Sequence, residues 1–135
     1  MARVRASFAR QGAMATLGAE LVDAAAGRVV IALPIDERLS QQDGFLHAGV
    51  VVAALDSACG YAALTVMPDD SEVLTVELKV NLLAPASGDS LVAEGEVVRA
   101  GRTFTVCRGD AFAEQPGERT HVATMLATMV RRRAE

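Results

Sequence analysis

The sequence contains few of the residues that form disulfides, metal sites and large aromatic clusters. Its 135 residues include no tryptophan, one tyrosine and two cysteines. Cys59 and Cys107 lie far apart, and neither belongs to a Cys-x-x-Cys motif or a Cys/His pair. We therefore expect no disulfide framework and no metal site, and two free, buried thiols.

Three further features are absent, and each absence argues against a class of protein. The most apolar stretch, residues 47–67, is interrupted by Asp56, Ser57 and Thr65, which argues against a membrane span. Residues 1–10 contain arginines but no apolar run, unlike a secretory signal, so we expect a cytoplasmic protein. Basic residues are not in excess: 13 Lys and Arg against 17 Asp and Glu give a net charge of −4, which disfavours a nucleic-acid partner.

The composition is that of one globular domain. Hydrophobic residues make up 51% of the chain and charged residues 22%, a balance that argues against disorder. The chain contains no internal repeat, no low-complexity segment and no linker rich in Pro, Gly or Ser. We therefore expect a single domain over residues 1–135.

The first third of the chain predicts a helix, a hairpin and a loop. Residues 4–14 predict a short, partly basic helix. Two apolar runs, 17–25 and 28–33, are separated by Ala26-Gly27 and predict a β-hairpin. The polar residues 35–45 predict a loop that leads to the next element.

Residues 47–67, HAGVVVAALDSACGYAALTVM, form the most distinctive segment. The segment carries one formal charge, at Asp56, and is otherwise apolar on every face. A helix of this kind must be surrounded by protein. We therefore expect one long, central helix with a sheet wrapped around it.

The second half of the chain predicts that sheet. Residues 73–83 alternate between apolar and polar side chains, which is typical of a half-exposed strand. Three more strands are predicted over residues 90–98, 103–113 and 120–130, and residues 131–135 are expected to form a charged tail. We expect the four strands to form an antiparallel meander, so the predicted fold class is α+β, with one antiparallel sheet curled around one helix.

Asp56 is the residue that most needs an explanation. Burying a lone carboxylate costs on the order of several kcal/mol unless a partner is present or the pKa rises. Asp56 could be structural, near the open end of the helix or hydrogen-bonded to a backbone group. It could also be functional, because the glycine-containing turn Asp43-Gly44 and the predicted helix start His47-Ala48-Gly49 precede it. Free backbone N–H groups at a helix start can hold a developing oxyanion.

The spacing of His47 and Asp56 favours a dimer. The two residues are nine positions apart, which is roughly 13 Å along a helix and about half a turn around it. One chain therefore cannot direct both residues at one carbonyl group. If two chains pack antiparallel about a two-fold axis, the helix start of one faces Asp56 of the other, and two shared sites result.

The string GFLHAGVVVAALDSACGYAAL resembles the HGG…D signature of hotdog-fold acyl-CoA thioesterases, in the phenylacetate-degradation (PaaI-like) branch of the 4-hydroxybenzoyl-CoA thioesterase superfamily. The resemblance extends from about residue 15 to 130, and its specific part is the nine-residue step from histidine to acid. It implies the hotdog fold, a long helix wrapped by an antiparallel sheet. It also implies an enzyme that hydrolyses an aryl- or medium-chain acyl-CoA to free acid and CoA, with no cofactor apart from the coenzyme A of the substrate.

The resemblance implies roles for five residues. Asp56 matches the catalytic carboxylate, which attacks the thioester carbonyl or activates a water for that attack. The N–H of Ala48, or of Gly49 beside it, matches the group that polarises the thioester oxygen, and His47 matches a histidine that positions the loop. Gln41 falls where PaaI-like members commonly carry asparagine, and its amide could orient water or bind the carbonyl.

Three further residues are weaker candidates for substrate binding. Arg99 and Arg102 flank the Ala100-Gly101 turn and could hold the phosphates of coenzyme A, or could simply be solvated. Tyr61 could line the acyl pocket or belong to the core. The chain also departs from the family pattern, since Ala48 replaces the usual second glycine of the signature.

Two alternative functions stay open at this point. A hotdog hydratase or dehydratase would act on acyl thioesters without breaking the thioester, and a non-catalytic module would bind acyl-CoA without consuming it. Whichever function holds, we expect a homodimer that pairs again into a homotetramer, as is common in this branch. We expect neither nucleic acid nor membrane as a partner.

Overall fold

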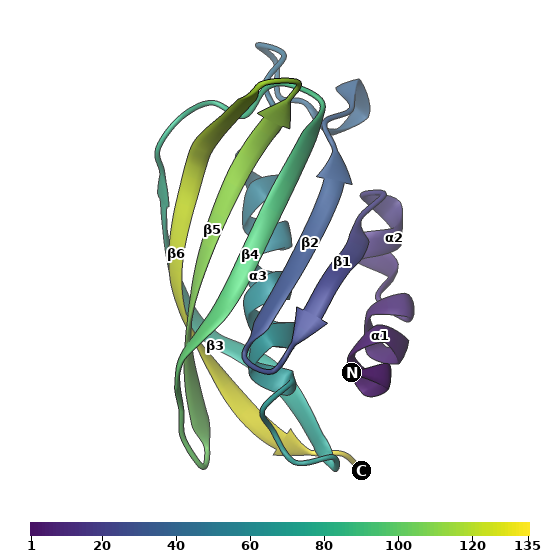
Figure 1. Cartoon of the computed structure of the whole chain (residues 1–135), viewed down its shortest axis with the longest axis vertical. Coiled ribbons are helices and arrows are strands. Elements are labelled where there is room, and N and C mark those ends of the chain that lie inside the picture. Colours follow the sequence, from purple (N-terminus) through teal and green to yellow (C-terminus); the bar gives the residue numbers. More distant parts are fainter.

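The structure, a computed structural model, describes all 135 residues. Its elements in chain order are α1 (Ala2–Ala9), α2 (Gly12–Thr16), β1 (Glu20–Ala25), β2 (Arg28–Pro34), the 3-10 helix η1 (Glu37–Leu39), α3 (Ala48–Leu64), β3 (Ser71–Leu82), β4 (Ser90–Ala100), β5 (Phe104–Gln115) and β6 (Glu118–Arg133). The strands form one antiparallel sheet in the order β1-β2-β4-β5-β6-β3. Figure 1 shows the curved sheet lying against α3, with α1 and α2 beside β1. The predicted α+β class, a sheet curled around one long helix, is confirmed.

The predicted four-strand meander is wrong in the position of β3. Strands β4, β5 and β6 are consecutive neighbours, but β3 pairs with β6 and lies at the far edge of the sheet. The predicted tail over residues 131–135 is also wrong for its first part, because Arg131 to Arg133 continue β6 opposite residues 71–73. Alternation along a sequence reports which side chains share a face, but it does not report which strand lies beside which.

The predicted helix over residues 4–14 is two helices. The chain leaves the helical conformation at Gln11, whose φ of −81° and ψ of 100° are extended, and Gly12 begins α2 instead of ending a helix. The hairpin and the loop over residues 35–45 are confirmed, with the short helix η1 inside the loop. The central helix ends at Leu64, three residues before the predicted end and shortly before Pro68.

Small residues let the sheet pack tightly on α3. A side chain at Gly95 of β4 would collide with the backbone of Ala58, and one at Gly109 of β5 would press on Leu55 and Cys59. The helix contributes eleven buried residues to the core from Val51 to Leu64. This close packing fixes α3 against β4 and β5 and therefore fixes the two ends of the helix in space.

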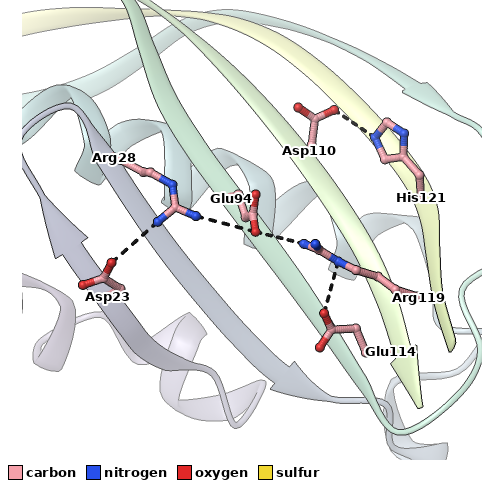
Figure 2. A network of polar contacts seen from close by, with 7 residues as sticks. All are labelled: Asp23, Arg28, Glu94, Asp110, Glu114, Arg119 and His121. Carbon is pink, nitrogen blue, oxygen red and sulfur yellow. Dashed lines mark hydrogen bonds and ion pairs between the residues drawn. The ribbon is translucent and has the colours of Figure 1, made fainter. Parts of the chain in front are cut away.

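The face of the sheet turned away from α3 carries a network of ion pairs, shown in Figure 2. Glu94 lies at its centre, with its Oε1 at 2.9 Å from a nitrogen of Arg119 and 3.7 Å from a nitrogen of Arg28. The network extends to Asp23 and Glu114, and His121 pairs with Asp110 beside it at 2.8 Å. The helix thus covers only one face of the sheet.

Both cysteines are free and buried, as predicted. Burial raises the pKa of the Cys59 thiol, and the nearby Cys107 adds to the rise. Burial also raises the pKa of Cys107, to about 11. No helix has the length and apolar character needed to cross a bilayer. No group of three or more His, Cys, Asp or Glu side chains converges to a site that could hold a metal ion.

Candidate active site

The start of α3 leaves one backbone amide available. His47 is the N-cap residue, and its ring Nδ1 accepts a hydrogen bond from the N–H of Gly49 at 2.8 Å. This bond requires the tautomer with the proton on Nε2. Ala48 is the first helical residue, so its N–H has no partner within the helix, and the residue is exposed. Of the two candidate amides, that of Gly49 is engaged by His47 and that of Ala48 is open.

Gln41 sits in a tight turn just before the helix. Its side-chain oxygen accepts hydrogen bonds from the N–H groups of Asp43 at 2.6 Å and Phe45 at 3.2 Å. The turn is closed by a backbone bond from the N–H of Gln41 to the carbonyl of Phe45, and Gly44 adopts a φ of +88°, which favours glycine. Because the oxygen is engaged, the side chain offers its NH₂ group, a donor, to a ligand.

Gln41 and Ala48 line one cavity of about 470 Å³, the Gln41 cavity. Nine of its eleven lining residues are hydrophobic. They come from the loop before α3, from the first turns of α3, from the end of β3 and the residues that follow it, and from Val122 of β6. The cavity therefore joins two hydrogen-bond donors to an apolar wall.

Asp56 lies on the side of α3 that faces β3. The hydroxyl of Thr75 on β3 donates a hydrogen bond to Asp56 Oδ1 at 2.6 Å. Asp56 is partly exposed in the single chain, so it is not the lone buried carboxylate that the apolar helix predicts. Thr75 is not among the site residues predicted from the sequence, although it lies on the polar side of the β3 alternation.

Asp56 lines a second cavity of about 510 Å³, the Asp56 cavity. Its walls are α1, the α1–α2 link, α3 and the first half of β3. Tyr61 is both a core residue and part of this wall. Ser57 and Gln11, which sequence reasoning missed, form a hydrogen-bonded chain with Tyr61 along the wall. Only six of the sixteen lining residues are hydrophobic, in contrast to the Gln41 cavity.

The predicted site residues are thus divided within one chain. Gln41 and Ala48 line one cavity, Asp56 and Tyr61 line the other, and no predicted site residue lines both. His47 and Gly49 are exposed at the helix start. The two remaining candidates are Arg99, at the end of β4, and Arg102, in the turn that follows; both are exposed and line neither cavity.

Residues 43–120, which include the helix start, Asp56 and Tyr61, match the Thioesterase superfamily. The chain belongs to the thioesterase superfamily. Its antiparallel sheet around α3 is the hotdog fold that the sequence resemblance implied. A solved structure of a thioesterase family protein from Silicibacter pomeroyi is 51% identical, covers 98% of this chain and 97% of that one, and superposes with a TM-score of 0.96.

Other proteins similar to this chain are more distant. A protein of Saccharolobus solfataricus is 37% identical over 90 residues, which cover 67% of this chain and 64% of that protein. The 1,4-dihydroxy-2-naphthoyl-CoA hydrolase of Listeria monocytogenes is 30% identical over 95 residues, 70% of this chain and 77% of the hydrolase. The PaaI protein of Escherichia coli, from the phenylacetic acid degradation operon, shares the fold with a TM-score of 0.87 over 98% of this chain and 93% of that one, at 18% identity. The chain thus spans less than two thirds of the length of the first of these relatives.

Proposed function

We propose that this thioesterase superfamily member hydrolyses acyl-CoA thioesters at two identical sites, each shared between two copies of the chain. The observation that carries the proposal is the division of the site residues between two cavities. The donors of Gln41 and Ala48 lie in one cavity and the carboxylate of Asp56 lies in the other. The Gln41 cavity lacks the carboxylate, and the Asp56 cavity lacks the oxyanion donors, that acyl transfer uses.

The edge strand β3 supports the way in which two copies would join these halves. Its outer edge is unpaired, and its apolar side chains Leu74, Val76 and Leu78 are exposed by 49%, 52% and 36%. Such an edge favours pairing with another strand. The first half of β3 borders the Asp56 cavity, and Leu82 borders the Gln41 cavity.

We therefore propose that β3 pairs antiparallel with its own copy. A two-fold axis at Lys79 would put Thr75 opposite the partner's Leu82, because the bulge between Thr75 and Glu77 adds one residue to the strand. The Asp56 cavity of one chain would then lie beside the Gln41 cavity of the other, twice per dimer. A two-fold axis near the middle of β3 thus completes both sites with one interface.

In the proposed reaction Asp56 acts on the thioester carbonyl carbon. As a general base it takes a proton from water while the water oxygen bonds to that carbon, and as a nucleophile its own oxygen forms the bond and water later hydrolyses the anhydride. In either route the C–S bond breaks, CoA leaves as a thiolate that takes up a proton, and the free acid remains. Thr75 holds one carboxylate oxygen and leaves the other available for this chemistry.

The helix start of the other chain stabilises the charge that develops on the carbonyl oxygen. The open N–H of Ala48 and the positive end of the α3 dipole favour an oxyanion there. The NH₂ group of Gln41 is a second donor, either to this oxygen or to the attacking water. His47 holds Gly49 through its Nδ1 and so positions the helix start.

The acyl-CoA substrate is supported by the name of the Listeria relative, a CoA hydrolase. From the signature around His47 and Asp56 we propose the PaaI-like branch, with an aryl- or medium-chain acyl group; PaaI itself shares the fold. The reaction written above uses only water and side chains, so we propose no cofactor besides the CoA of the substrate. Arg99 and Arg102 remain the proposed contacts for its phosphates. The two free thiols are consistent with a reducing compartment, and we propose the cytoplasm.

A homotetramer is proposed from the outer face of the sheet. Val98, Phe104 and Leu126 are exposed there by 54%, 52% and 52%. The ion pairs of Figure 2, whose acidic and basic groups alternate, lie on the same sheet. Two dimers could pack these faces together and bury both the apolar groups and part of the network.

The proposed activity is tested by release of free CoA thiol. Wild-type protein and the variant Asp56→Asn would be given a panel of aryl-, short- and medium-chain acyl-CoAs, with product masses recorded. We expect the wild type to release CoA from at least one substrate and the variant to release almost none. Thioesters that gain or lose water while remaining intact would instead indicate a hydratase or dehydratase. Binding of CoA without any turnover would indicate a binding module.

The shared site is tested by mixing two inactive variants. Asp56→Asn removes the carboxylate, and Ala48→Pro removes the backbone donor. In a mixed dimer one site would carry both defects and the other none. We expect an equal mixture, after subunit exchange, to recover about a quarter of wild-type activity. Sites formed within one chain would recover nothing.

A further inference from the structure

Gly60 leaves open space in the wall of the Asp56 cavity. It lies in the interior of α3, where glycine is less favourable than alanine. A side chain built at Gly60 would meet no atom within 4 Å, whereas one at Gly95 or Gly109 would collide with its neighbours. Packing therefore explains the other two glycines but not Gly60. Because Gly60 lines the cavity one helical turn beyond Asp56, its missing side chain enlarges the cavity next to the carboxylate.

The same wall carries a chain of polar groups. The Ser57 hydroxyl donates to Gln11 Oε1 at 3.0 Å, and Gln11 Nε2 donates to the Tyr61 hydroxyl at 3.1 Å. Ser57 and Tyr61 are buried, with 8% and 7% of their surfaces exposed. Gln11 Nε2 has a second proton that these bonds do not use. The Ser7 hydroxyl, 3.3 Å from the Tyr61 oxygen, extends the chain toward α1.

The unused proton of Gln11 Nε2 needs an acceptor when water leaves the cavity, because the other groups of the chain already bond one another. A hydrocarbon packed against Gln11 would displace water and leave this donor unsatisfied, which is costly in a buried site. A ligand that carries a hydroxyl or carbonyl oxygen at the same place would accept this proton from the amide that Ser57 and Tyr61 hold in position. Sites built in this way reject an analogue that lacks the polar group.

The position of the cavity suits the acyl half of the substrate. Asp56 would act at the carbonyl carbon, so the acyl group begins beside Asp56 and can continue past Gly60. Its far end meets Gln11 and Tyr61, where α1 and the α1–α2 link close the cavity. The CoA half must instead lead out to solvent.

We propose that Gln11, Tyr61 and Ser57 select acyl groups that carry a neutral hydrogen-bonding group at their far end, and that Gly60 provides the room for such a group. This inference rests on the proposed thioesterase activity. It assigns specificity, not chemistry, to the α1–α2 link, a segment outside the stretch that matches the superfamily.

The test compares acyl-CoAs that differ by one hydroxyl. One pair is hexanoyl-CoA and 6-hydroxyhexanoyl-CoA, and the other is 3-phenylpropanoyl-CoA and its 4-hydroxyphenyl analogue. We expect wild-type kcat/KM to favour the hydroxylated member of at least one pair by about tenfold or more. Gln11→Met and Tyr61→Phe keep the side-chain size and should reduce this preference at least threefold, mainly by raising kcat/KM of the plain member relative to its partner.

Gly60→Ala tests the space separately. It should lower kcat/KM for both long acyl groups at least tenfold and leave acetyl-CoA much less affected, while the melting temperature stays the same or rises. Gly12→Ala is the matched control, because Gly12 also has no neighbour within 4 Å but does not line the cavity. It should leave the acyl preference unchanged.

The outcomes separate this inference from the activity itself. If no acyl-CoA releases thiol, the proposed thioesterase function is wrong. If thiol is released and depends on Asp56, but the paired substrates react equally and Gly60→Ala has no effect on long acyl groups, the activity stands and the specificity inference is overturned.

Discussion

Thr75 on the edge strand β3 donates a 2.6 Å hydrogen bond to Asp56 on the central helix. This bond connects the proposed catalytic carboxylate to the strand along which we propose that a second copy pairs. It also fixes one oxygen of the carboxylate, so the rotation of the side chain is restricted before a substrate arrives. Such preorganisation is worth more in the transition state than in the ground state.

Thr75→Val removes this hydroxyl while keeping the shape of the side chain. A hydrogen bond to a charged group contributes about 1.5–3 kcal/mol, so we expect kcat to fall roughly 10- to 100-fold with little change in KM. The matched control is Thr128→Val, which also removes a 2.6 Å bond from a threonine to a carboxylate, that of Glu77. Steady-state kinetics on both variants make the comparison. An equal loss in the two variants would indicate a general effect on the sheet edge.

Ala48→Pro should remove the proposed oxyanion donor without breaking the helix. Ala48 is the first residue of α3, the position at which proline is best tolerated, and His47 before it has φ −60° and ψ 134°, which a following proline permits. Loss of one such donor lowers kcat by about 100-fold or more. Ala48→Gly keeps the N–H and should retain most activity. Normal turnover by the proline variant, with an unchanged melting curve, would assign the oxyanion to Gln41 instead.

The sequence was sufficient to predict α3 and the strands, because their periodicity and composition are local properties. It placed Asp56 and the start of α3 correctly on one helix, nine residues apart. The neighbours of β3 were not predictable in the same way, since the chain that leaves α3 could have joined either edge of the sheet. Thr75 was missed for that reason: its contact with Asp56 exists only because β3 lies at this edge.

The polar wall of the Asp56 cavity was out of reach of sequence reasoning for a related reason. Gln11 and Tyr61 are 50 residues apart, and no local pattern connects them. The local pattern predicts one continuous helix through Gln11, whereas the helix breaks there and the side chain turns toward α3. Tyr61 packs in the core and also lines the Asp56 cavity, and its role toward an acyl group stays a prediction.

The capping role of His47 predicts a difference between two substitutions. His47→Ala removes the acceptor for the Gly49 N–H and should destabilise the protein by about 1 kcal/mol, as loss of an N-cap does. His47→Asn supplies another good N-cap acceptor and should restore most of the stability and most of the activity. Urea unfolding midpoints together with kcat separate the two roles. A stable but inactive asparagine variant would show that the histidine contacts the substrate.

The two buried thiols predict how the protein responds to alkaline pH. Burial raises the pKa of Cys107 from 9.0 to about 11, and it raises that of Cys59 as well. Above pH 9 the unfolded chain therefore loses these protons while the folded chain retains them, so folding stability should be complete below pH 9 and should fall as pH rises toward 11. Urea unfolding at pH 8 and pH 10.5 measures this loss of stability. The variant Cys107→Ala should be less stable than the wild type at both pH values, but its free energy of unfolding should fall less from pH 8 to pH 10.5. A slope with pH that is the same in wild type and variant would contradict the assignment to Cys107.

Burial of both thiols also predicts how the protein reacts with thiol reagents. Because neither thiol is exposed, such reagents at pH 8 should label the native protein only after denaturant is added. The protein's own thiols should therefore not contribute to the signal in the assay for released CoA.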